Sequence, residues 1–102
     1  MIKAKVYKNQ NKDVYAFKIK KHGDPRVCAA VSLLSLNAIN SVDKFTQQAF
    51  THKINNNGYL AFKCRSDTVD KDAALLLNSL LLGLVGIAKS YPNDIKLIIK
   101  EM

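Results

Sequence analysis

The segment from Leu75 to Ala88 constrains the fold most, because it is apolar on almost every side of a helix. The surrounding pattern predicts one helix over residues 71–90, which Pro92 then stops. A β-sheet covers only one side of a helix, so the remaining leucines must contact the other helix or another subunit. Two polar residues and two glycines interrupt the segment: Asn78, Ser79, Gly83 and Gly86. Its apolar part is shorter than the about 20 residues that span a bilayer, so we expect no membrane span.

The rest of the chain alternates between strand and helix patterns. Apolar residues at every second position predict five strands, and a stripe from Val27 to Val42 at helical spacing predicts a first helix. Asn55 to Gly58 is a strong hairpin turn, because Asn and Gly accept a positive φ. The expected order is ββαββαβ, an α+β fold with two helices packed on a mainly antiparallel sheet. The predicted strands cover residues 2–7, 15–20, 49–54, 59–64 and 95–99.

Length and cysteine content indicate the class of protein. A chain of 102 residues without a Pro/Gly/Ser-rich linker is expected to form one domain over residues 1–102. Two cysteines are too few for a disulfide scaffold, which fits a reducing cytosol. The start of the chain, Met1 to Lys5, alternates charged and apolar residues and does not resemble a signal peptide. We therefore expect a cytoplasmic protein.

The formal net charge of +8 comes almost entirely from lysine. A basic chain can bind phosphate groups or acidic surfaces. The chain has only two arginines and no cluster of arginine with aromatic residues, so a solvated lysine surface is favoured over nucleic-acid binding.

A histidine and a cysteine lie six residues apart, at the expected junction of a strand and a helix. Gly23 and Pro25 break regular structure, so a loop should end near Arg26 and the first helix should begin at Val27 or Cys28. Unpaired N–H groups and the helix dipole favour a thiolate at such a position, and the thiolate is the nucleophile. His22 could fold back as its base. The same residues also fit a small buried cysteine beside a solvated histidine, and this spacing alone does not decide between the two.

The residues around Cys28 match a known sequence motif. Val27-Cys28-Ala29-Ala30-Val31-Ser32, preceded by His22-Gly23, resembles the signature of the ribosomal-processing cysteine protease family, called Prp. The likeness extends to the chain length, the residues Ser32 to Ser35, the hairpin at Asn57 to Leu60, and the final helix and strand.

The resemblance implies a cysteine endopeptidase with His22 and Cys28 as the catalytic pair and Ser32 as a supporting hydroxyl. It also implies a homodimer. The implied substrate is the N-terminal extension of large-subunit ribosomal protein twenty-seven. Two departures concern the loop of Gly23, Pro25 and Arg26. This loop is shorter than in many relatives, and Pro25 stands where the family often has Asp, with Asp24 next to it as a possible substitute.

In the expected mechanism, Cys28 attacks the scissile carbonyl, and His22 takes the thiol proton and gives it to the leaving amine. Free backbone N–H groups at the start of the helix would stabilise the oxyanion. The alternative is a non-catalytic, basic and dimeric module that binds ribosomal RNA or protein, with Cys28 as a packing residue.

The other histidine and cysteine are given no catalytic role. Cys64 ends a strand with nothing nearby to activate it, and His52 has no cysteine near it in sequence. The four residues His22, Cys28, His52 and Cys64 do not have the spacing of zinc ligands. Neither a metal nor a cofactor is therefore expected.

Overall fold

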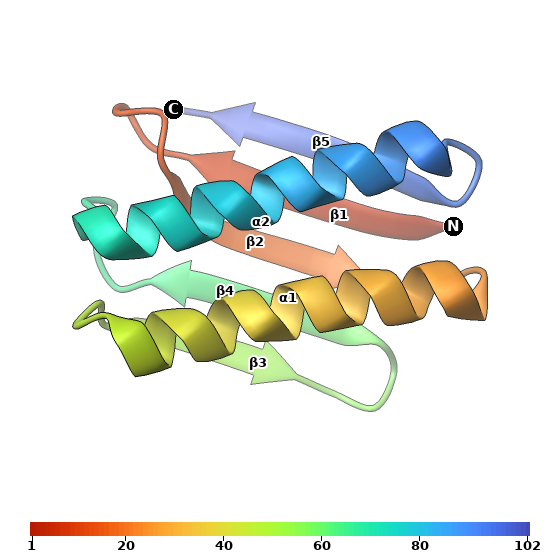
Figure 1. The fold of residues 1–102 in the computed structure, drawn as a ribbon, viewed down its shortest axis with the longest axis horizontal. Helices are drawn as coiled ribbons and strands as arrows, with labels where there is room; N and C mark the ends of the chain where they lie inside the picture. Colours follow the sequence, from red (N-terminus) through yellow and green to blue (C-terminus); the bar gives the residue numbers. More distant parts are fainter.

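A five-stranded sheet with both helices on one of its faces forms the fold (Figure 1). The computed structural model describes residues 1–102. The elements follow one another as β1 (Ile2–Lys8), β2 (Val14–Lys20), α1 (Pro25–Phe45), β3 (Phe50–Ile54), β4 (Tyr59–Cys64), α2 (Lys71–Ser90) and β5 (Ile95–Glu101). This order confirms the predicted ββαββαβ arrangement and the α+β class.

The strands lie in the spatial order β3-β4-β2-β1-β5. The pairs β1–β2, β2–β4 and β3–β4 are antiparallel, while β5 runs parallel to β1. Parallel pairing requires a crossover, which α2 provides as it runs back over the sheet between β4 and β5. The sheet is therefore mainly antiparallel, as predicted, with one parallel edge strand.

Helix α1 begins two residues before the expected start and ends three residues after the expected end. Pro25 is the first helical residue, a position where its fixed φ and missing N–H cost nothing. Asp24 caps the helix with its side chain. The restriction on residues before proline applies to Asp24, which has extended geometry, and not to the helix that follows.

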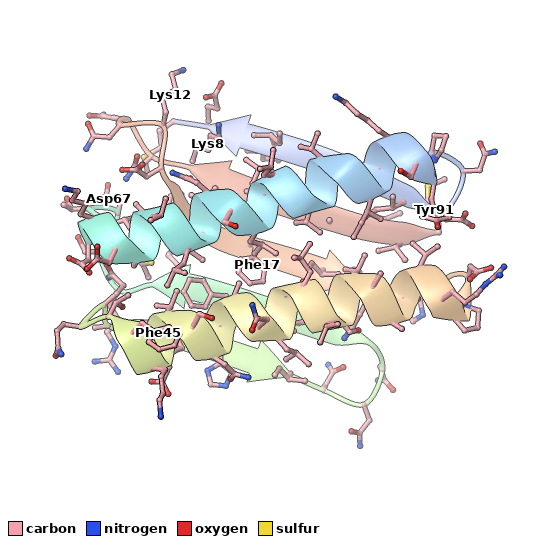
Figure 2. The ribbon with its side chains drawn as sticks, viewed as in Figure 1. Lys8, Lys12, Phe17, Phe45, Asp67 and Tyr91 are labelled. Carbon is pink, nitrogen blue, oxygen red and sulfur yellow. The ribbon has the colours of Figure 1, made fainter.

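The core fills the space between the sheet and the two helices. Phe17 of β2 points from the sheet toward the helices and is fully buried (Figure 2). Its ring stacks on that of Phe62 with centroids 5.2 Å apart. The helices approach each other closely at Gly83, where an added Cβ would lie 2.5 Å from Cδ2 of Leu34.

Helix α2 has 20 residues and is apolar enough to cross a membrane by length and composition alone. The whole helix is longer than the apolar segment considered in the sequence. Its inner side is packed in the core, however, with Leu77 and Leu84 fully buried. We therefore interpret α2 as the core helix of this domain.

The outer surface of the helix pair remains apolar. Leu33 of α1 and Leu82 of α2 are both 74% exposed. A shallow hollow of about 630 Å³ lies between the helices and is lined by Ala30, Leu33, Leu34, Asn37, Gly83 and Ile87. Helix α1 thus covers only part of α2.

Candidate active site

His22 lies in the loop that connects β2 to α1, and Cys28 lies in the first turn of α1. β2 ends at Lys20, so His22 stands in the loop two residues later with an exposed side chain. Cys28 is the fourth residue of α1, is half-buried and packs against the core. The two residues are six positions apart in the sequence, and Cys28 keeps part of its surface accessible.

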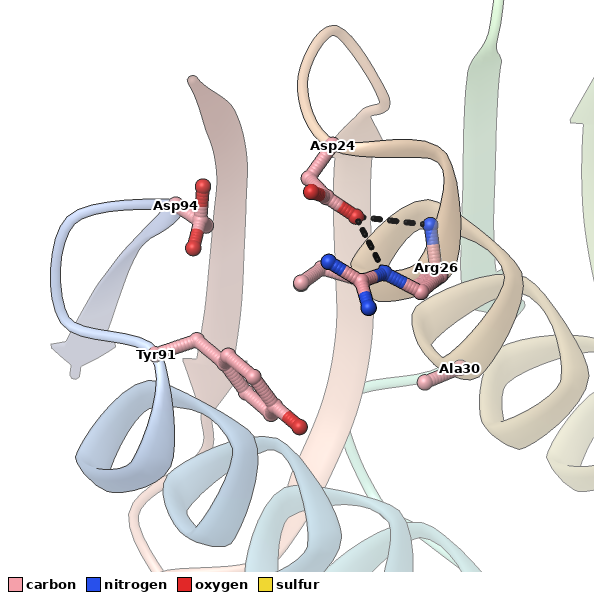
Figure 3. Close-up of a pocket in the computed structure, with 6 residues that line it drawn as sticks. Asp24, Arg26, Ala30, Tyr91 and Asp94 are labelled. Atoms are coloured by element: carbon pink, nitrogen blue, oxygen red, sulfur yellow. Dashed lines mark hydrogen bonds and ion pairs between the residues drawn. The ribbon is translucent and has the colours of Figure 1, made fainter.

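Asp24 organises this segment. Its Oδ1 accepts a hydrogen bond from the backbone N–H of Arg26 at 2.8 Å, and the Nε of Arg26 lies 3.6 Å from the same oxygen (Figure 3). The hydrogen bond from the Arg26 backbone, with smaller contributions from Val27 and the guanidinium, lowers the pKa of Asp24 below its usual value. Asp24 is therefore an ionised cap that holds the start of α1.

Two backbone N–H groups at the start of α1 already donate hydrogen bonds. Pro25 has none, Arg26 donates to the carboxylate of Asp24, and Cys28 donates to the backbone carbonyl of Asp24 at 2.9 Å. Among the first four residues of α1, Val27 has a backbone N–H that makes no hydrogen bond, so the expectation of free N–H groups at this position holds for Val27 alone. The helix begins earlier than predicted, so the N–H of Cys28 already makes the first bond within the helix.

A small hollow of about 200 Å³ adjoins the start of α1. Asp24, Arg26 and Ala30 lie on one side, and Tyr91 and Asp94, from the end of α2 and the turn before β5, lie on the other (Figure 3). Local sequence patterns gave no sign of Tyr91 or Asp94, because only the pairing of β5 with β1 brings them here. Neither His22 nor Cys28 lines this hollow.

The loop before α1 contacts the start of β1 and the turn before β5. The backbone of Gly23 lies beside Ile2 and the carbonyl of Asp94, and an added Cβ would meet Cγ1 of Ile2 at 3.4 Å. The N–H of Ile2 donates to that carbonyl at 2.9 Å. Gly23 therefore lies beside the start of β1 and the turn that precedes β5.

Ser32, His22 and Cys28 have no side-chain hydrogen bond to one another. The only side-chain hydrogen bond between residues 21 and 28 is the one that Asp24 accepts. Ser32 is half-buried one turn after Cys28. Ser35, which the sequence did not single out, is buried on α1 and its Oγ has no partner. Catalytic hydrogen bonds are often long before substrate binds, so the roles of His22, Cys28 and Ser32 stay predictions.

The second cysteine differs in its surroundings. Cys64 is fully buried at the end of β4, and this burial raises the pKa of its thiol to about 11. His52 is exposed on β3, with its ring 5.8 Å from that of Phe50. The structure contains no cluster of three or more His, Cys, Asp or Glu side chains that could hold a metal ion.

Comparisons with known proteins give a family and a fold. The family model described as cysteine protease Prp matches residues 1–96. The essential ribosomal processing protease Prp from S. aureus, solved with a covalently linked product peptide, has a TM-score of 0.89 at 23% identity over 98% of this chain and 100% of that chain. The same protease with a substrate peptide also has a TM-score of 0.89, at 20% identity over 98% of this chain and 100% of that chain.

A third structure has the same fold in another organism. SMU.848 from Streptococcus mutans has a TM-score of 0.89 at 22% identity, over 100% of this chain and 96% of that chain. No protein of curated function matches the sequence. The structural matches show the fold, and the family model covers almost the whole chain. The chain therefore belongs to the Prp family of cysteine proteases.

Proposed function

We propose that residues 1–102 form a single cysteine endopeptidase domain that removes the N-terminal extension of large-subunit ribosomal protein twenty-seven in the cytoplasm. The observation that supports this most is the difference between the two thiols. Cys28 is partly accessible at the start of α1 beside the loop of His22, whereas Cys64 is buried with a pKa of about 11. This difference supports Cys28, and not Cys64, as the proposed nucleophile.

In the proposed reaction, the Sγ of Cys28 attacks the scissile carbonyl carbon while His22 accepts the thiol proton. The tetrahedral intermediate collapses, the C–N bond breaks, and His22 gives its proton to the leaving amine. Water, activated by His22, then attacks the thioester and releases the acid and the free thiol. Ser32 supports Cys28 from the next helical turn.

The oxyanion of this intermediate needs hydrogen-bond donors. The N–H of Arg26 is occupied by Asp24, so it can serve an oxyanion only after the carboxylate of Asp24 has moved away. The loop of Gly23, Pro25 and Arg26 must then change conformation when a peptide binds. Asp24 has the supporting role of holding the resting loop and the helix start in place.

A peptide substrate is also supported by the relatives. The S. aureus protease has been solved with a substrate peptide and with a covalently linked product peptide. A short extended segment can bind beside a small domain of this kind through backbone hydrogen bonds to a strand edge.

The proposal is tested with a synthetic peptide that spans the extension and the first residues of the mature ribosomal protein. Mass spectrometry should show one cut that releases the extension, while casein should stay intact. The Cys64→Ala variant is the matched control and should keep the activity, because Cys64 lies in the core. The proposal fails if the folded wild-type chain leaves the peptide uncut, or if Cys28→Ala cuts it at the wild-type rate.

We further propose a homodimer that buries the apolar outer surface of α1 and α2. Leu33, Leu75 and Leu82 are each more than 70% exposed there, at 74%, 71% and 74%. Large apolar side chains exposed on one side of a domain are typical of an interface between subunits. Leu84, two residues after Leu82, is fully buried and belongs to the core.

Sedimentation equilibrium at micromolar concentration should show a dimer for the wild type and a monomer for Leu82→Glu. The charge would have to be desolvated in the interface, whereas Leu82 is exposed in the single chain and its substitution leaves the fold intact. Asn56→Glu in the exposed β3–β4 hairpin is the control and should stay dimeric. A wild-type monomer at these concentrations would refute the dimer.

A further inference from the structure

The sheet has a face that no helix covers, directed away from the viewer in Figure 1. Strand residues alternate between the helix side and this side, so the burial pattern and the strand pairing assign each residue to a face. Eight of the chain's fourteen lysines project from the uncovered side, which we call the open face, and no Asp or Glu does. These lysines are Lys3, Lys5, Lys18, Lys20, Lys53, Lys63, Lys96 and Lys100.

The strand pairing places these lysines directly opposite one another. Lys3 pairs with Lys20 across β1 and β2 and with Lys96 across β1 and β5, and Lys5 pairs with Lys18. Like charges that face each other on neighbouring strands are destabilising. The ion pairs of the structure, Lys12–Glu101 and Arg26–Asp24, both lie elsewhere, so nothing within the chain neutralises this face.

Two tyrosines lie among the lysines. A shallow hollow of about 550 Å³ on the open face is lined by lysines together with Tyr7, Tyr59 and Ile98. Both tyrosine side chains are half-buried, and the Nζ of Lys18 lies 6.0 Å from the centroid of the Tyr7 ring. The open face therefore combines positive charge with aromatic surface.

We propose that the open face binds single-stranded RNA, with its phosphates on the lysines and its bases stacked on Tyr7 and Tyr59. Aromatic rings on a sheet stack unpaired bases, and a positively charged surface follows the backbone. The lysines lie about 6.6 Å apart along a strand and about 4.8 Å apart between strands, which gives a flexible polyphosphate many contact points.

The positive charge and the tyrosine rings together favour single-stranded RNA over a second copy of the chain, duplex RNA or an acidic peptide. A second copy of the chain would bring eight lysines against eight lysines, which repel each other. Duplex RNA hides the faces of its bases, so the two tyrosines would have nothing to stack on. An acidic peptide could pair with lysines but would not need the tyrosines. This site lies on the sheet, and the proposal is independent of the peptidase activity.

Binding is measured by fluorescence anisotropy with a labelled 15-nucleotide oligouridylate at 50, 100 and 200 mM KCl. If about five phosphates are contacted, log K should fall with log [KCl] with a slope of about −3.5. The fourfold variant Lys3→Gln, Lys5→Gln, Lys18→Gln and Lys20→Gln should bind at least about 30-fold more weakly, because it loses four of these charges. The double variant Tyr7→Leu and Tyr59→Leu should bind at least about 10-fold more weakly, because it loses the two rings on which bases stack.

A matched fourfold variant changes Lys12, Lys44, Lys71 and Lys89 to Gln. These lysines are exposed on the helices and the β1–β2 turn, and the formal net charge falls from +8 to +4 in both fourfold variants. The control should bind within about threefold of the wild type, since none of its four lysines lies on the open face. Equal losses in the two fourfold variants would overturn the proposal, because net charge alone would then explain the binding.

Two other probes test whether the open face prefers duplex RNA or an acidic peptide to single-stranded RNA. A 15-base-pair RNA duplex and an oligoglutamate peptide should both bind at least about 10-fold more weakly than the single strand, because neither offers stacked bases to the tyrosines. Binding of either probe as tight as that of the single strand would overturn the proposal. Cleavage of the extension peptide by the open-face variants is recorded in parallel, so a failure of the RNA site is distinguished from a failure of the peptidase.

Discussion

Replacing Cys28 or His22 by alanine should lower the rate of cleavage of the extension peptide by at least about 1,000-fold. The double variant should be little slower than either single variant, because a nucleophile and its base act as one unit. Rates are measured by mass spectrometry with the peptide in excess. His22 is exposed and Cys28 is half-buried, so neither alanine removes a large part of the core.

Matched controls make this test specific. His52→Ala and Cys64→Ala replace the other residue of each kind and should keep the rate within a few-fold of the wild type. Ser32→Ala should cost about 10-fold or less, because in the proposed mechanism Ser32 supports Cys28 and does not react. A His22→Ala rate within a few-fold of the wild type would refute the dyad even if the peptide is cut.

Raising the pH from 8 to 10.5 should lower the free energy of unfolding by about 2 kcal/mol through Cys64 alone. The thiol has a pKa of about 11 in the native state and of about 9.0 when exposed, because burial disfavours the thiolate. Below pH 9 both states hold the proton and the thiol contributes nothing to the pH dependence. Between pH 9 and 11 the unfolded chain loses its proton first, so the unfolded state is favoured as pH rises.

Urea unfolding at the two pH values measures this effect. Lysines and tyrosines also titrate in this range, so the informative quantity is the difference between variants. Cys64→Ala should lose this part of the pH dependence, whereas Cys28→Ala should keep it. The same pH dependence in both variants would show that Cys64 is not responsible.

The sequence predicted the elements that have strong local signals. The helix Lys71–Ser90 and the strand Tyr59–Cys64 have the predicted bounds, because an apolar helix, a hairpin turn and a proline mark them. The start of α1 was misplaced, because the capping by Asp24 overrides the tendency of Pro25 to mark a loop. The parallel pairing of β5 with β1 could not be predicted, since no local pattern records which strands become neighbours.

The candidate site has a local part, which the sequence could propose, and a part that depends on the fold. His22 and Cys28 are close in sequence, so a local motif was enough to propose them. The hollow beside Asp24 depends on Tyr91 and Asp94, which are distant in sequence and meet it only in the folded sheet. The open face shows the same limit. The alternation of Lys3 with Lys5 is visible in the sequence, but only the strand register aligns these lysines with those of β2 and β5.

The pairing of the earliest strand with the latest one affects the order of events during synthesis. β1 leaves the ribosome first, yet its parallel partner β5 begins only at Ile95. A growing chain at about 5–20 residues per second therefore has one side of β1 unpaired for several seconds. The hollow beside Asp24 also needs Tyr91 and Asp94, so it forms in the same late step. A nascent chain thus keeps one edge of β1 open until β5 has docked, and the hollow at the start of α1 is completed only at that point.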